Sequence, residues 1–300
     1  MRDLTFIRSR PWATLYRVDA AEGRWWLKIN HGLTVYEPRI LSALTGLGSA
    51  LVPEALTHDD EPWALIADAG TEVRAVWTGR ERAEQVRLWS EVVVAYAELQ
   101  QSMTLAGRPA GVPDFTPGAA LTRFDEVVAD LDWFGPECAP DLTPPEWDRV
   151  RGCRPYLAQA VARLAGGLAP SIQHDDLHDA NVLSDGERAR IIDWGDAVWA
   201  HPFQTMLITL DSLAATWRVS VEDADVRRVR DAYVDAWRGP GWSIAELREQ
   251  LQLARRTGGL TRAACWIRAL GTPVVARELD SADAPAHWMV RLADALTPSG

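Results

Sequence analysis

The sequence predicts an α+β protein with a small β-rich N-terminal lobe and a larger, mostly helical C-terminal lobe. Three observations lead to this fold class. Residues 4–30 contain short runs rich in β-branched and aromatic side chains, separated by turns. From about residue 82 onward, apolar residues recur at the three- and four-residue spacing of amphipathic helices. A single β insertion around Asp185-Gly186 interrupts this helical part.

The N-terminal lobe is predicted to span residues 1–70. Apolar residues at helical spacing predict one helix over 36–47. The runs rich in β-formers predict strands at 4–7, 14–20, 24–30, 49–56 and 62–70.

The C-terminal lobe is predicted to span residues 71–300. The longest amphipathic pattern covers residues 82–101 and is followed by a stretch rich in proline and glycine. The later helices are expected at 122–132, 146–166, 203–217, 221–238, 244–256 and 260–270. The proline-rich residues 140–145 and the C-terminal tail are expected to be loops.

Composition narrows the class of function. The chain has 31 basic and 42 acidic residues and a net charge of −11, which argues against a nucleic-acid partner and permits a cationic small substrate. Its three widely spaced cysteines are expected to be buried free thiols. The N-terminal residues resemble no secretory leader, and no apolar run has membrane length. We therefore expect a cytoplasmic enzyme or binding protein with no membrane partner, of undetermined oligomeric state.

The stretch HDDLHDANV, residues 174–182, is unusually dense in polar side chains. It leads into two apolar runs around Asp185-Gly186, which is a strong hairpin signal. If these two residues form the turn, Asn181 lies opposite Arg190 and Asp193 lies about level with His178. The returning strand then brings Asp193 beside the polar stretch.

Three oxygen-bearing side chains should therefore meet at one end of this hairpin: those of Asp176, Asn181 and Asp193. Carboxylate and carboxamide oxygens without cysteine suit magnesium that arrives with substrate phosphates. A carboxylate that does not bind the metal can accept a proton from an attacking hydroxyl group. The geometry expected from the turn thus predicts a site for phosphoryl transfer.

His174-x-Asp176 with Asn181, followed by Asp193-Trp194-Gly195, resembles the catalytic loop and the metal-binding loop of kinases. The form that carries His178 is similar to the aminoglycoside phosphotransferase-like small-molecule kinases, and the resemblance covers most of the chain. It implies a protein-kinase-like two-lobed fold, ATP or GTP with Mg²⁺ as cofactors, and a small-molecule hydroxyl as acceptor.

The resemblance also implies roles for individual residues. Asp176 would be the catalytic base, Asn181 and Asp193 the magnesium ligands, and His174 and His178 supports for the loop. Asp175 could compete with Asp176 for the role of base, but the five-residue spacing to Asn181 selects Asp176. Asp175 is expected at the surface or bonded to local backbone. Asp196 is either a substrate contact or a solvated turn residue.

For the nucleotide, the resemblance implies that Lys28 pairs with phosphates, that Glu37 is its ion-pair partner, and that Ala67 and Asp68 belong to the hinge beside the base. The alternatives are a solvated lysine, a capping box in which Thr34 pairs with Glu37, and plain turn residues at the hinge. The loop between the first two strands contains no glycine. No tryptophan is expected to contact a ligand.

Residues 120–150 contain eight acidic residues, including Asp125 and Glu126, against two arginines. This excess indicates either a solvated helix surface or an anionic rim that attracts an acceptor bearing an amine, such as an aminosugar, an aminoglycoside or an amino alcohol.

The sequence is also compatible with two rival functions. One is a zinc hydrolase that uses His174 and His178, which would require helical geometry at these residues. The other is a catalytically weak kinase fold that serves as a binding module.

Overall fold

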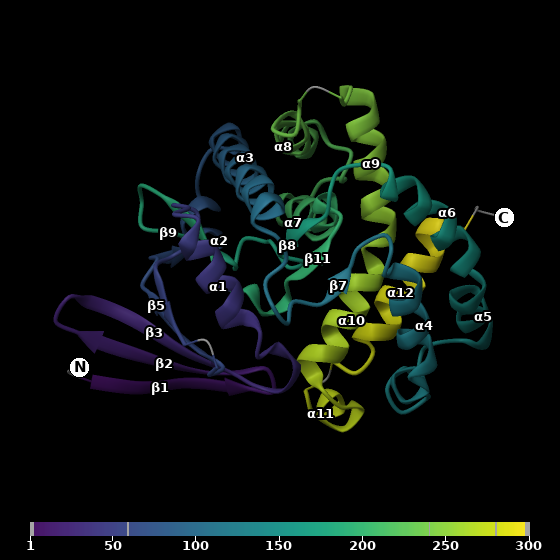
Figure 1. Cartoon of the computed structure of the whole chain (residues 1–300), viewed down its shortest axis with the longest axis horizontal. Coiled ribbons are helices and arrows are strands. Elements are labelled where there is room, and N and C mark those ends of the chain that lie inside the picture. The colour runs from purple at the N-terminus through teal and green to yellow at the C-terminus, as the bar shows by residue number, and fades with distance from the viewer. Residues whose placement is uncertain (1–2, 59, 240, 280, 298–300) are drawn as a thin grey trace.

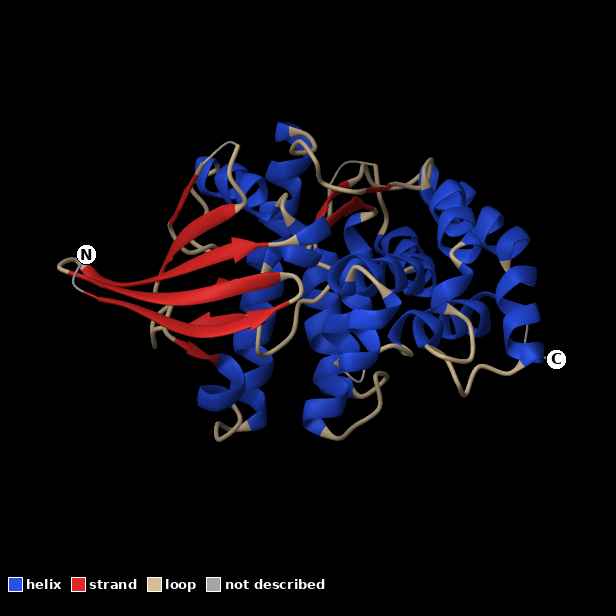
Figure 2. Cartoon of the chain, turned by 90° about the horizontal axis from the view of Figure 1, so that it is seen from below, coloured by secondary structure: helices blue, strands red, loops and turns tan. Residues whose placement is uncertain are grey.

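An antiparallel sheet and a large set of helices divide the chain between them. The computed structural model describes residues 3–58, 60–239, 241–279 and 281–297. Figure 1 shows the sheet near the N-terminus, and Figure 2 shows it from a second side, with most helices beyond it. The predicted α+β class, with a β-rich N-terminal part and a mostly helical C-terminal part, is confirmed.

The N-terminal sheet has five strands in the order β1-β2-β3-β5-β4, and helix α1 (Glu37–Gly46) packs beside β4. Its strands are β1 (Asp3–Arg10), β2 (Ala13–Ala20), β3 (Gly23–Asn30), β4 (Ala55–Thr57) and β5 (Trp63–Ala67). The strand expected over 49–56 was too long, because Pro53 cannot donate a ladder hydrogen bond and only β4 forms. Leu51 is buried in the core without being in a strand.

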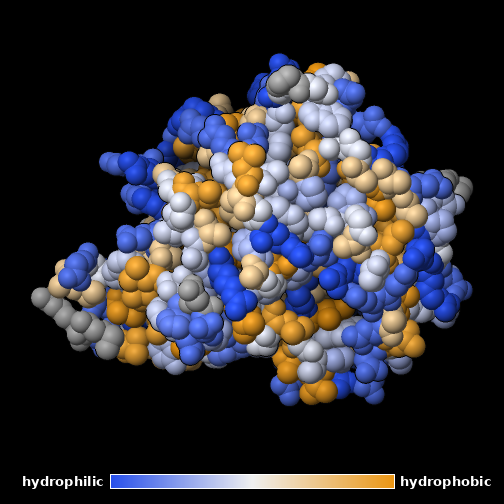
Figure 3. Space-filling model, viewed as in Figure 1, coloured by the Kyte–Doolittle hydropathy of each residue, from blue (hydrophilic) through white to orange (hydrophobic). Residues whose placement is uncertain are grey.

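Strand β1 forms one edge of this sheet. Its register with β2 shifts between Phe6 and Arg8, which marks a β-bulge, a feature that hinders pairing of edge strands between molecules. Leu4 and Phe6 are exposed. In Figure 3, apolar residues are visible on the part of the surface that covers the sheet.

The predicted helices form with two corrections, and two further short helices, at 73–77 and 273–278, were not predicted. Beyond α1, the α-helices are α2 (Val73–Trp77), α3 (Arg82–Ala106), α4 (Ala120–Ala129), α5 (Pro144–Gly152), α6 (Arg154–Ala165), α7 (Met206–Trp217), α8 (Ala224–Asp235), α9 (Ile244–Thr257), α10 (Gly259–Leu270), α11 (Pro273–Glu278) and α12 (Ala284–Leu296). The single helix expected over 146–166 is two helices, because Pro155 starts a new helix and cannot continue the previous one. The tail expected as a loop forms α12, which buries Met289 and Leu292.

The β insertion is a hairpin of β9 (Val182–Ser184) and β10 (Ala189–Ile191). Ser184 pairs with Ala189, so the loop has four residues, and the two-residue turn expected from the sequence was wrong. The loop widens because the Asp185 carboxylate accepts hydrogen bonds from the backbone N–H groups of residues 187 and 188. A shift of two residues keeps every side chain on its expected face.

Two small sheets join distant segments. In one, the β9–β10 hairpin is extended by β6 (Thr71–Glu72). In the other, β11 (Val198–Ala200) lies between β7 (Asp114–Phe115) and β8 (Ser171–Gln173). Since β8 leads into residues 174–181 and β11 follows the Asp193 segment, their pairing holds the two ends of the candidate site together.

The three cysteines are free and buried, as expected. Among the residues that the structure describes, no helix combines the length and the apolar character needed to cross a membrane.

Gly70→Ala is expected to destabilise the fold by about 2–4 kcal/mol. Gly70 has a φ of +96°, and an added Cβ would lie 2.2 Å from the backbone oxygen of Ser184, so a strained backbone combines with a clash. Denaturant unfolding measures the effect. Gly48→Ala is the control, because Gly48 also has a positive φ of +67° but open space around it, and it should cost only ~1 kcal/mol. Equal midpoints for the two variants would contradict the clash.

Candidate active site

The loop of residues 174–181 connects β8 to β9 and is anchored by His174, which is fully buried. The His174 Nε2 atom lies 2.8 Å from the carbonyl oxygen of Ile192, and Nδ1 accepts a hydrogen bond from the N–H of Asp176 at 3.3 Å. Burial lowers the pKa of His174, so the ring is neutral. His174 therefore ties the loop to the segment that carries Asp193.

Asp176 lies at the surface of this loop with 26% of its side chain exposed. One carboxylate oxygen, Oδ2, is 3.3 Å from His178 Nε2, and the other, Oδ1, is 3.2 Å from a guanidinium nitrogen of Arg262. Burial alone would raise the pKa of Asp176, but Arg262 and His178 hold it well below its ordinary value. Asp176 is therefore ionised at neutral pH.

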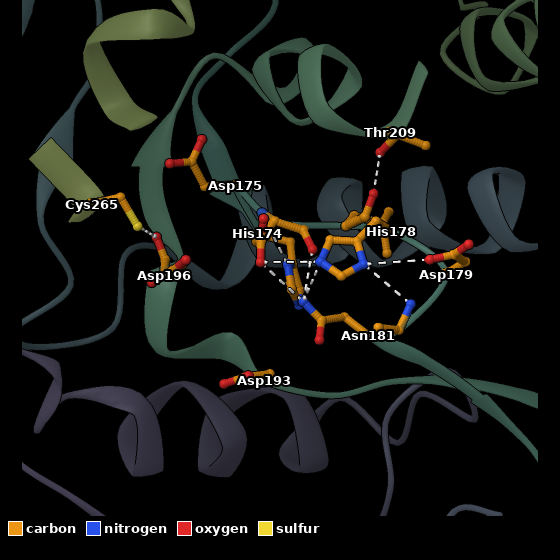
Figure 4. Close-up of polar contacts among 12 residues, drawn as sticks. His174, Asp175, His178, Asp179, Asn181, Asp193, Asp196, Thr209 and Cys265 are labelled. Carbon is orange, nitrogen blue, oxygen red and sulfur yellow. Dashed lines mark hydrogen bonds and ion pairs between the residues drawn. The ribbon is translucent and has the colours of Figure 1, made fainter. Parts of the chain in front are cut away.

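Asn181 has one carboxamide group with two different tasks. Its Nδ2 donates to the carbonyl oxygen of Asp176 at 2.9 Å and to the Asp176 carboxylate at 3.2 Å. Its Oδ1 therefore points away from that carboxylate. This leaves the oxygen, the atom of the carboxamide that can bind a metal ion, free of the Asp176 side chain. Figure 4 shows the side chains of His178 and Asn181 grouped together, with Asp193 on the segment opposite.

Lys28 connects the N-terminal sheet to the Asp193 segment. Its Nζ lies 2.6 Å from a carboxylate oxygen of Glu37 and 2.5 Å from Asp193 Oδ1. Burial alone would lower the pKa of Lys28, but the charges of Asp193 and Glu37 raise it above its ordinary value. Lys28 in turn lowers the pKa of Asp193. The solvated lysine considered from the sequence is therefore wrong.

Glu37 is fully buried at the first residue of α1. Its carboxylate accepts hydrogen bonds from Asn30 Nδ2 at 2.6 Å and from the backbone N–H of Trp194 at 3.0 Å. The alternative capping box is wrong, because the Thr34 hydroxyl donates to the carbonyl oxygens of Trp12 and residue 31 instead. Glu37 holds Lys28 and the start of the Trp194-Gly195 turn in one place.

The oxygens of Asn181 and Asp193 fit a hard divalent cation. The described residues contain no group of three or more His, Cys, Asp or Glu side chains that could hold a metal alone. A magnesium ion bound here would therefore complete its coordination with phosphate oxygens and water, as Mg²⁺ commonly does. Asp193 has a φ of +63°, a strained conformation of the kind that concentrates at functional sites.

The zinc hydrolase alternative is wrong. Residues 174–178 form no helix, so His174 and His178 do not share a helix face. Both ring nitrogens of His174 are already engaged with backbone groups.

Asp175 is not at the surface, contrary to expectation. Its side chain is 2% exposed and accepts hydrogen bonds from the Thr261 hydroxyl at 2.8 Å and from Gln173 Nε2 at 3.0 Å. Burial raises the pKa of Asp175 to about 6, although Arg262 opposes the shift. In Figure 4 its carboxylate points away from Asn181 and Asp193.

A cavity of about 120 Å³ opens beside Asp176 and Asp193, and its lining includes Trp12, Asp196, Arg262 and Trp266. The sequence interpretation allowed a role for Asp196 but named none of the other three and excluded tryptophans. Arg262 carried a usable signal, because a charged residue stands among apolar neighbours on the buried face of α10. Trp12 carried none, since its position depends on how the turn between β1 and β2 lies over the other lobe.

Both acidic residues that were named for the rim, Asp125 and Glu126, are paired with arginines. Asp125 forms two contacts of 2.7 Å with Arg154, and Glu126 lies 2.6 Å from Arg123. Glu126 lines a second cleft of about 430 Å³, whereas Asp125 is not part of that lining. The two residues therefore occupy different surroundings.

Ala67 is the last residue of β5, and Asp68 follows it in the segment predicted to be the hinge. Their backbone N–H groups bond to the carbonyl oxygens of Glu54 at 2.8 Å and Arg24 at 3.1 Å. The Asp68 carboxylate accepts a hydrogen bond from Trp26 Nε1 at 3.1 Å. These N–H groups are therefore not available to a nucleotide base, and any contact with a base here uses other atoms.

Comparisons with solved structures show the fold. A choline/ethanolamine kinase family protein from Mesorhizobium loti is 16% identical with a TM-score of 0.59, and the match covers 98% of this chain and 92% of that one. An ethanolamine kinase from Plasmodium vivax is 12% identical with a TM-score of 0.62, covering 99% and 82%. A thermostable mutant of an aminoglycoside phosphotransferase, in a ternary complex with AMP-PNP and hygromycin B, is 15% identical with a TM-score of 0.55, covering 99% and 95%.

No curated protein sequence matches the chain. The model of the phosphotransferase enzyme family matches residues 7–250, which include Lys28, the 174–181 loop and Asp193. This match confirms the resemblance that was drawn from the motifs. The chain belongs to the phosphotransferase enzyme family.

Proposed function

We propose that the protein transfers the γ-phosphoryl group of ATP or GTP to a hydroxyl group of a small molecule in the cytoplasm, with Mg²⁺ bound to the phosphates. Family membership makes the chain a phosphotransferase enzyme rather than a binding module. The observation that supports the proposal best is that Asp176 and Asp193 line one cavity. Lys28 contacts Asp193, and Asn181 donates a hydrogen bond to the Asp176 carboxylate. A structurally similar aminoglycoside phosphotransferase binds AMP-PNP, which supports nucleotide use here.

Lys28 would orient the phosphate groups of the nucleotide. The contacts with Glu37 and Asp193 keep it charged and fix its position between the sheet and the cavity. Asn181 and Asp193 would hold Mg²⁺, which when bound neutralises phosphate charge. The positive charge of Lys28 then needs no reorganisation when negative charge shifts during transfer.

In this proposal Asp176 binds the acceptor hydroxyl and receives its proton. Since Arg262 and His178 hold its pKa low, Asp176 is a weak base and does not deprotonate a free alcohol. It orients the hydroxyl by accepting its hydrogen bond, and it takes the proton once bond formation to phosphorus has made that oxygen acidic.

A screen of hydroxylated compounds with γ-labelled ATP tests the proposal. The parent protein is expected to move label into a small-molecule product in the presence of magnesium. Chelation of the metal should stop the transfer. Transfer that proceeds at full rate with the metal chelated would contradict the assignment of Asn181 and Asp193.

Active acceptors are expected to be cationic amines whose apparent affinity falls as salt rises. The cavity is lined by the carboxylates of Asp176, Asp193 and Asp196 and by one arginine. Attraction by surface charge is screened by salt over ~8–10 Å. Michaelis constants measured over a salt series check this result. A best acceptor that is neutral or anionic, or whose affinity ignores salt, would contradict it.

Glu126→Gln is expected to raise the Michaelis constant for such an acceptor and to leave that for ATP unchanged, because Glu126 lines the second cleft, which shares helix α10 with the lining of the Asp176 cavity. Asp125→Asn is the matched control, since Asp125 belongs to the same helix but pairs with Arg154 outside that lining. Equal effects of the two variants would show that only general surface charge acts.

A further inference from the structure

Arg262 connects helix α10 to two segments of the candidate site, and it lies outside the residues that match the family model. It lies on α10, beyond residue 250, and is 5% exposed. Its guanidinium nitrogens lie 3.0 Å from the carbonyl oxygen of Asp175, 3.2 Å from Asp176 Oδ1 and 3.4 Å from Asp196 Oδ2. One rigid group thus touches both consecutive aspartates of the loop and the turn after Gly195.

The surroundings of Arg262 restrict its movement. The Trp288 ring of α12 lies 5.7 Å from the guanidinium carbon. The neighbouring residue on α10, Thr261, donates its hydroxyl hydrogen to the Asp175 carboxylate at 2.8 Å. Helix α10 therefore contacts the loop through two side chains, the neutral hydroxyl of Thr261 and the charged guanidinium of Arg262.

The backbone conformation of Asp175 links this attachment to the position of Asp176. Asp175 has a φ of +63°, in the left-handed region that glycine adopts most easily. An aspartate in this conformation is strained. Its buried carboxylate accepts hydrogen bonds from Thr261 and Gln173, which stabilise the residue in this conformation. The strained residue immediately precedes Asp176, so a small backbone shift at 175 moves the Asp176 carboxylate.

We propose that Arg262 is a positioning residue, which together with Thr261 aims the Asp176 carboxylate into the cavity that receives the acceptor. This inference rests on the proposed function, in which Asp176 binds the acceptor hydroxyl. A guanidinium presents two parallel N–H donors at fixed geometry, whereas an ammonium group supplies charge without that geometry. Lysine at position 262 therefore separates orientation from charge balance.

Arg262→Lys is expected to lower kcat at least ~10-fold, because a displacement on the order of 1 Å at a reacting group costs up to ~100-fold. The Michaelis constants for ATP and acceptor should stay within about twofold, since the interactions lost act on the transition state. Arg255→Lys is the matched control. Arg255 lies on α9, pairs with Asp211 at 3.0 Å and does not line the cavity. It should keep the parent kcat.

A purely structural role for Arg262 predicts a different result, namely a lower melting temperature with normal kcat well below that temperature. A folded Arg262→Lys protein with parent kcat would overturn the proposal. If that variant does not fold, Thr261→Val tests the same attachment without removing a charge. Its kcat should fall several-fold with unchanged Michaelis constants, and an unchanged kcat would overturn the proposal.

Asp176→Asn in the same assay separates this inference from the proposed function. An inactive Asp176→Asn beside a fully active Arg262→Lys removes the role of Arg262 and leaves the function intact. A fully active Asp176→Asn removes the function on which the inference rests.

Discussion

Asp176→Asn is expected to lower turnover at least ~100-fold while the protein keeps its fold and its affinity for nucleotide. The asparagine has the same size but cannot accept the hydroxyl proton, and its amide would meet the Arg262 guanidinium where a carboxylate now lies 3.2 Å away. Steady-state kinetics at saturating ATP and acceptor measure the loss, and circular dichroism checks the fold. Near-normal turnover in a folded variant would exclude Asp176 from the catalytic role.

Asp175→Asn is the neighbouring control and should lose much less turnover. Its carboxamide oxygen can still accept the hydrogen bond from Thr261, and the carbonyl oxygen that receives Arg262 is unchanged. If Asp175→Asn proved the more damaging substitution, the base would have been assigned to the wrong residue of the pair.

Asp193→Ala is expected to abolish magnesium-dependent binding of ATP, because a magnesium ion that accompanies the phosphates would lose its carboxylate ligand. The same substitution removes the partner that lies 2.5 Å from Lys28 Nζ, so the lysine would also lose its fixed position. Calorimetry with and without magnesium measures both contributions.

Asp185→Ala is the control for that experiment. Asp185 lies on the same hairpin but pairs with Arg190 at the loop, and it is not one of the proposed metal ligands. It should leave the effect of magnesium unchanged. Equal affinity for ATP in Asp193→Ala and the parent would show that Asp193 is only a residue at the end of the hairpin.

The sequence patterns predicted the strands and helices that depend mainly on neighbouring residues. The dense β-formers of residues 13–30 form β2 and β3, and the helical spacing from residue 82 forms α3. The hairpin placed Asp193 near Asn181 although the loop length was wrong, because the error of two residues preserves the face of each side chain. Prolines were less reliable guides, since Pro155 divides a predicted helix and Pro285 begins one that was not expected.

The rest of the site depends on packing between distant segments. Arg262 meets Asp175 across 87 residues of sequence, and only the docking of α10 brings them together. The burial of Asp175 follows from the same docking, so neither its exposure nor its partner could be predicted from the loop alone. The position of Trp12 over the cavity depends in a similar way on how the N-terminal sheet lies against α10.

Phosphorus NMR of a single reaction mixture tests the central claim most directly. The parent protein with ATP, magnesium and an acceptor found in the screen should produce one phosphate monoester resonance that grows in step with ADP, and Asp176→Asn should produce almost none. Growth of inorganic phosphate alone, at the same rate in both proteins, would contradict phosphoryl transfer to a hydroxyl group at this site.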